Sequence, residues 1–270
     1  MTAELAWLWA AVAGYVAAGS LAIVTVVLNK RPGRTVLALM AAGLALHAVS
    51  LALRWTRLGH GPFITMFEIL SSNVWSLALV FSLAYWRVCA LRPAAAVVMP
   101  VLFVMMGWLV LTSPGEGHFP PTYHTVWLYV HVGLGKVFLG SVLVAVGIAG
   151  IILLRTAGSS VARLAALPDD IRFEELAFRF MVLGFVFETL MLIAGAIWAQ
   201  DAWGRYWAWD PLETWSFITW LTLAFFIHLR VTVKLRPCYC AALIVAVFAL
   251  AFVTFFGVPF VSTVPHQGAV

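Results

Sequence analysis

The sequence predicts an all-α membrane protein, a bundle of about eight transmembrane helices with both termini outside. Three observations predict it. First, 64% of the 270 residues are hydrophobic and only 10% are charged, whereas a water-soluble surface needs roughly a quarter of charged residues. Second, the apolar residues fall into runs of about 20, the length that crosses a bilayer as a helix. Third, the basic residues gather in alternate loops, which sets the orientation of the bundle.

The expected helices follow from the apolar runs in order. Lipid leaves only helices or closed barrels, and barrel strands would alternate with period two. The longest segment between runs, about 155–175, contains LPDDIRFEEL, which we interpret as a solvated loop with a short surface helix. The eight runs lie at roughly 5–28, 35–55, 69–87, 95–112, 127–154, 176–199, 214–233 and 239–261.

The loops after the first, third, fifth and seventh runs hold 12 of the 16 basic residues. By the positive-inside rule these loops face the cytoplasm, so the net charge of +5 indicates orientation rather than nucleic-acid binding. The segment between the sixth and seventh runs then faces outward. Cys89, Cys238 and Cys240 fall at cytoplasmic ends without a C-x-x-C motif, as expected of structural thiols. The basic residues are Lys30, Arg31, Arg34, Arg87, Arg92, Arg155, Arg163, Arg172, Arg179, Arg230, Lys234 and Arg236.

The outward segment WGRYWAWDPLETW, residues 203–215, concentrates four tryptophans with a tyrosine and several charges. One interpretation is an aromatic belt at the membrane interface. The other is a binding surface for a flat aromatic ligand. A belt explains scattered tryptophans better than it explains several in one loop beside Asp210, Pro211 and Glu213.

The histidines favour a binding surface. None of the seven lies on the predicted cytoplasmic surface, and ionisable residues inside a membrane are functional candidates by default. A flat apolar wall with one or two imidazoles is the site that iron porphyrin requires. The histidines comprise His60, His118 and His124 in outer loops, His131 at the outer end of the fifth run, His266 beyond the eighth, and His47 and His228 inside the membrane.

The run WGRYWAWDPLETWSFITWL resembles the tryptophan-rich WWD signature of haem-handling proteins. With the following IHLR and the upstream LALRWTRLGHGPFITMFEIL, the chain is similar over nearly its whole length to the CcsA family of cytochrome c maturation, called System II. The resemblance implies that residues 1–270 form a single integral-membrane haem-handling domain, with the WWD loop at about 200–215. It also implies the bacterial inner membrane, with this loop on the extracytoplasmic side.

The resemblance implies that the protein binds haem b as a substrate. With a CcsB-type membrane partner, it would attach the haem to the C-x-x-C-H thiols of apocytochrome c, which thioredoxin-like proteins keep reduced. Haem lyase activity is then expected only in the complex. The alternative is a CcmC-like delivery protein that passes haem to a chaperone without forming thioethers. A b-type electron carrier would need two intramembrane histidine pairs, whereas only His47 and His228 lie inside the membrane.

The resemblance also implies the roles of individual residues. His131 and His266 match the outer axial ligands, and His228 matches the intramembrane ligand, whose counterpart belongs to the partner or, alternatively, is His47. Asp210 and Glu213 are expected to cap the seventh helix or to bond a ligand imidazole. The residues expected against the porphyrin are Trp203, Tyr206, Trp207, Trp209, Asp210 and Trp215.

Four basic residues lie away from the cytoplasmic loops. At least one of Arg54, Arg57 and Arg205 is expected to pair with a haem propionate, and the alternative is interfacial snorkelling. Lys136 and Glu188 both lie about 15 Å deep by helical rise. We expect them to form an ion pair, because an unpaired charge at that depth costs several kcal/mol.

Overall fold

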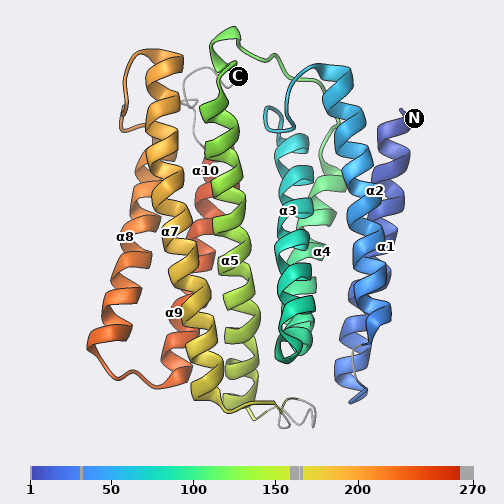
Figure 1. Ribbon diagram of the computed structural model, residues 1–270, viewed down its shortest axis with the longest axis vertical. Coiled ribbons are helices and arrows are strands. Elements are labelled where there is room, and N and C mark those ends of the chain that lie inside the picture. The colour runs from blue at the N-terminus through green and yellow to red at the C-terminus, as the bar shows by residue number, and fades with distance from the viewer. Residues whose placement is uncertain (1, 31–32, 159–163, 165–166, 262–270) are drawn as a thin grey trace.

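The computed structural model describes residues 2–30, 33–158, 164 and 167–261, and these residues form helices without strands, as the sequence predicts (Figure 1). The α-helices are α1 (Ala3–Val27), α2 (Arg34–Leu58), α3 (Met66–Arg87), α4 (Ala95–Leu111), α5 (Val126–Thr156), α7 (Asp170–Trp203), α8 (Pro211–Thr232), α9 (Pro237–Phe252) and α10 (Val258–Val261). Two 3-10 turns, η1 (Cys89–Ala94) and η2 (Pro121–Tyr123), and a π-helical turn, η3 (Val253–Gly257), complete them.

Eight helical segments in the described part of the chain are long and apolar enough to cross a membrane. Each of the eight predicted runs corresponds to one of them, so the prediction of a multi-pass bundle is confirmed. The fourth span includes η1 before α4, and the last joins α9 to η3.

The helix α7 begins earlier than the sequence predicts. Its first turn is capped by the Asp169 side chain, which accepts a hydrogen bond from the Arg172 backbone N–H at 2.8 Å. Phe173 is buried, and Arg230 of α8 forms hydrogen-bonded ion pairs with Glu174 at 3.0 Å and Glu175 at 2.7 Å. The interpretation of this segment as a loop with a separate surface helix is therefore wrong from residue 170 onward.

The helix α5 is the centre of the bundle. It packs against α3 and α4 on one side and α7 and α9 on the other (Figure 1). In the most apolar 18-residue stretch of α5, 78% of the residues are buried, whereas the corresponding share for α8 is 22%. The helix α8 therefore lies at the periphery and presents most of its surface to lipid or to a partner.

The connections between helices alternate between the two ends of the bundle (Figure 1). One end of the bundle, which we call the site end, carries the loops 59–65, 112–125 and 204–210. The basic end carries the connections that follow α1, α3, α5 and α8, and those of the predicted cytoplasmic basic residues that the structure describes lie in or next to these connections. The predicted grouping of these loops at one end is confirmed. The compartment that each end faces stays a prediction.

Candidate functional site

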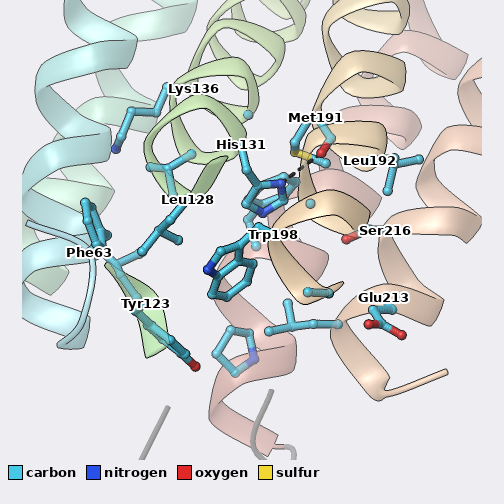
Figure 2. Close-up of a pocket in the computed structure, with 18 of the residues that line it drawn as sticks. Phe63, Tyr123, Leu128, His131, Lys136, Met191, Leu192, Trp198, Glu213 and Ser216 are labelled. Carbon is cyan, nitrogen blue, oxygen red and sulfur yellow. Dashed lines mark hydrogen bonds between the residues drawn. The ribbon is translucent and has the colours of Figure 1, made fainter. Parts of the chain in front are cut away.

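A cavity of about 430 Å³ lies at the site end, among α3, α5, α7, α8 and the loop 204–210 (Figure 2). Its volume is typical of small-molecule sites, which occupy roughly 300–1,000 Å³. Most of the lining side chains are apolar. The polar and aromatic-polar side chains among them are Ser72, Asn73, Tyr123, His131, Lys136, Trp198, Tyr206, Trp207, Glu213 and Ser216.

His131 lies in the second turn of α5 and its ring lines this cavity. Nδ1 lies 2.9 Å from the backbone oxygen of Met191 on α7, as the dashed line in Figure 2 shows. A carbonyl oxygen only accepts, so Nδ1 carries the hydrogen and Nε2 is the basic nitrogen of the neutral ring. This tautomer, held by a backbone carbonyl, is the one found in many metal-ligating histidines.

Two further contacts from α7 fix the position of the His131 ring. The Trp198 indole stacks on it, with ring centres 5.9 Å apart and planes inclined by 19°. Gly195 leaves the space that the imidazole occupies, since a Cβ there would lie 2.7 Å from Nδ1. The sequence therefore needs a glycine and a tryptophan, three residues apart on one face of α7, to seat this histidine.

The loop 204–210 is held at both of its ends. Gly204 ends α7 in the left-handed region (φ 72°), and its N–H donates to the Gln200 carbonyl at 2.9 Å. The Asp210 side chain caps α8 by accepting from the Glu213 backbone N–H at 2.8 Å. The Glu213 carboxylate reaches back to the Ala208 N–H at 2.7 Å. Of the two expected roles, capping of the helix is the one that the structure shows, for Asp210, while Glu213 bonds the backbone of the loop.

The aromatic residues of the segment 203–215 do not act as one surface. Tyr206 and Trp207 line the cavity, and the buried Trp207 Nε1 has no hydrogen-bond partner within the described residues. Trp203 packs edge-on against Trp198 instead, with ring centres 4.9 Å apart. Trp209 (66% exposed, φ 59°) and Trp215 (37% exposed) are not among the lining residues.

Several cavity residues were not predicted from the sequence. Tyr123 packs edge-on against Trp198 at 5.0 Å, and burial raises the pKa of its phenol to about 12. The phenol therefore stays protonated at physiological pH. Phe63, from the loop 59–65, also lines the cavity. Gly195 and Trp198 of α7 line the cavity and were missed as well. Their spacing could have indicated a shared surface, since residues three apart lie on one face of a helix.

Two of the other predicted iron ligands, His228 and His47, do not line this cavity. His228 is exposed on α8, 17 residues after Pro211 and thus roughly 25 Å further along the helix. His47 is fully buried between α1 and α3, with Nε2 2.9 Å from the Ser71 hydroxyl and Nδ1 3.4 Å from the Tyr15 hydroxyl. His266 lies outside the described residues.

The arginines expected to pair with propionates have other positions. Arg54 is buried and bonds Glu68 at 2.9 Å and Glu4 at 3.1 Å. Arg57 also pairs with Glu4, at 2.8 Å, and with Glu116. This network ties α1, α2 and α3 to the loop 112–125, and neither arginine lines the cavity. Arg205 is exposed and likewise does not line it.

The expected ion pair between Lys136 and Glu188 is not formed, so that prediction is wrong. Lys136 donates instead to the Ser72 hydroxyl on α3, at 2.8 Å. Glu188 is fully buried in α7, and neither of its carboxylate oxygens has a hydrogen-bond partner among the described residues. The two side chains come from neighbouring helices but extend to different neighbours, which helix depth alone does not reveal.

The fold defines a multi-pass membrane protein with a cavity of small-molecule size near one end of its bundle. Residues 35–266 match the family described as Cytochrome C assembly protein, and the chain belongs to this family. The predicted resemblance to CcsA is confirmed by curated relatives with the name "Cytochrome c biogenesis protein CcsA". The protein from Trachelium caeruleum is 26% identical over 77% of this chain and 77% of its own length. That from Prochlorococcus marinus (strain MIT 9301) is 29% identical over 81% and 79%.

A solved structure shares the fold. The protein named "Cytochrome c Heme Lyase CcmF" superposes with a TM-score of 0.70 at 19% identity and covers 95% of this chain. This chain spans 47% of the length of that protein, about half of it.

Proposed function

We propose that the protein holds haem in this cavity for attachment to apocytochrome c. Family membership assigns it to cytochrome c biogenesis. The observation that supports the finer proposal is the placement of His131, whose basic nitrogen is Nε2, in one apolar cavity with Tyr206 and Trp207. Haem iron binds the basic nitrogen of such an imidazole, and the flat macrocycle stacks against aromatic side chains of this kind.

The residues of the cavity suit this substrate in three ways. His131 supplies an axial ligand to the iron, and its hydrogen bond to Met191 fixes the orientation of the ring. Tyr206 and Trp207 offer aromatic contacts worth about 0.5–1.5 kcal/mol each beyond burial. The apolar lining excludes water. His266 is the proposed second outer ligand, so that the iron is six-coordinate until the histidine of the apocytochrome displaces one imidazole.

The reaction proposed at this site is the addition of two cysteine thiols to the two vinyl groups of haem. Each sulfur bonds to one vinyl carbon and the thiol proton passes to the other, so no oxidant or reductant is consumed. The acceleration would come from proximity and orientation, because holding both reactants replaces a bimolecular encounter. The protein needs no acid–base pair for this step.

The periphery of α8 supports a role for a CcsB-type partner. His228 is exposed there, and Leu221 (47%) and Phe225 (62%) extend the same exposed apolar helix. A partner helix against this surface would cover it and bring the second intramembrane ligand to His228. In this proposal the site end faces the extracytoplasmic side of the inner membrane, where apocytochrome c and thioredoxin-like reductants are found.

The test is haem content. The protein is purified in detergent and its reduced absorption spectrum is recorded for the wild type, H131A and H124A. His124 is exposed at the site end and does not line the cavity, so its variant serves as the control. We expect H131A to lose most of its haem and to recover it with added imidazole, while H124A retains haem. Equal haem in wild type and H131A would contradict the proposal.

Coexpression with a CcsB-type partner and a C-x-x-C-H substrate separates lyase from delivery. Haem that stays on the substrate through denaturing electrophoresis shows thioether formation. Haem that binds to the protein but never becomes covalent would instead support the delivery function.

A further inference from the structure

Lys136 places an amino group at the inner end of the cavity. It follows His131 by five residues on α5 and therefore lies about 7.5 Å deeper in the bundle. Figure 2 shows Lys136 extending toward α3 while His131 points toward α7, and both line the same cavity. The ammonium group donates to the Ser72 hydroxyl at 2.8 Å.

This ammonium has no carboxylate partner within the described residues. Glu213, the acidic residue in the lining, is on α8, where its carboxylate bonds the Ala208 N–H. Ser72, its hydrogen-bond partner, and Asn73, the next residue of α3 in the lining, bring no charge. A lysine at this depth is costly without an anion. An anionic group on a molecule that fills the cavity would therefore supply the ion-pair partner that Lys136 lacks among the described residues.

We propose that Lys136 binds a carboxylate of the porphyrin substrate and so sets which edge of the macrocycle enters first. This inference rests on the proposed function. The propionates and the vinyl groups of haem lie on different edges of the ring. With a propionate at Lys136 and the iron at His131, the acid edge points into the bundle. The vinyl groups then face the loop 204–210, where thiols arriving at the site end can reach them.

The inference explains why the arginines at the site end are not required for the propionates. Arg54 and Arg57 already pair with Glu4. Lys136 instead lines the cavity, and its partner is a neutral hydroxyl that an incoming carboxylate can join or displace. A single charge placed inside the bundle orients the ligand, whereas charges at the mouth would draw the acid edge outward.

The test compares two ligands that differ only in their acid groups. Iron protoporphyrin IX and its dimethyl ester are titrated into the purified full-length protein in detergent, with empty micelles as the blank. We expect the wild type to bind the diacid at least roughly tenfold more tightly than the diester. K136M should bind both with similar affinity, K136R should keep part of the preference, and H131A should weaken both ligands alike.

A second variant separates charge from local packing. S72A keeps the ammonium and removes its hydroxyl partner, so it should keep the preference for the diacid. K136Q replaces K136M if the latter does not elute as a folded protein. The inference is overturned if the wild type does not discriminate, or if the lysine variants discriminate as the wild type does. Failure of the wild type to bind either ligand would instead reject the proposed function, and this inference with it.

Discussion

Gly195→Ala tests how the His131 ring is held. An added Cβ would lie 2.7 Å from Nδ1 and 2.8 Å from Cε1, whereas ordinary contact begins at 3.4 Å. The imidazole must therefore move by about 0.7 Å (3.4 − 2.7), away from α7 and from the Met191 oxygen, which is now 2.9 Å from Nδ1. Loss of such an outer-shell partner weakens metal ligation by roughly 10- to 100-fold.

The assay is titration of haem into the purified protein, followed at the Soret band. We expect G195A to bind haem roughly 10- to 100-fold more weakly than the wild type. Its unfolding temperature should not fall, because alanine favours a helix over glycine by about 1 kcal/mol. G133A is the matched control, since a Cβ at Gly133 on α5 meets nothing within 4 Å. Wild-type affinity in G195A would refute the argument that this glycine seats the ligand.

Three further predictions concern stability and the aromatic wall. R54A should lower the free energy of unfolding by about 3–5 kcal/mol in detergent, because the buried Glu68 carboxylate loses its arginine and Glu4 keeps only Arg57. Loss of the exposed pair in R179A should cost about 1 kcal/mol or less. D210A should lower the free energy of unfolding by about 1 kcal/mol because it removes the cap of α8, whereas D210N should lower it by much less, since asparagine also caps helices. W207A should weaken haem binding by roughly two- to tenfold, while W86A, in the last turn of α3 and away from the cavity, should leave the dissociation constant unchanged.

The sequence predicted the fold more completely than the site. Apolar runs and basic loops are one-dimensional signals, and lipid turns them directly into spans and an alternating topology. The start of α7 was missed because its first turns depend on a tertiary pair, Arg230 with Glu174, and on an Asp169 cap within a charged segment. Helix ends of this kind are decided by local side-chain bonds rather than by hydropathy.

The sequence indicated some of the residues that line the cavity but not how they are arranged in space. His131 and Trp207 do share a cavity, whereas Trp209 packs edge-on against Trp207, with ring centres 5.6 Å apart, and stays 66% exposed outside the lining. Depth along a helix placed Lys136 and Glu188 at one level, yet the rotation of each helix decides which neighbour a side chain meets. The cavity therefore could not be assembled before α3, α5 and α7 were packed together.

The proposed function requires that one cavity at the site end brings together His131, Tyr206 and Trp207 around a porphyrin. A cryo-electron microscopy structure of the haem-loaded protein in a lipid nanodisc tests it most directly. We expect iron bonded to Nε2 of His131, with the macrocycle against the two aromatic side chains of the loop. Porphyrin density confined to the outer face of α8 beside His228, with the cavity filled only by protein or lipid, would contradict it.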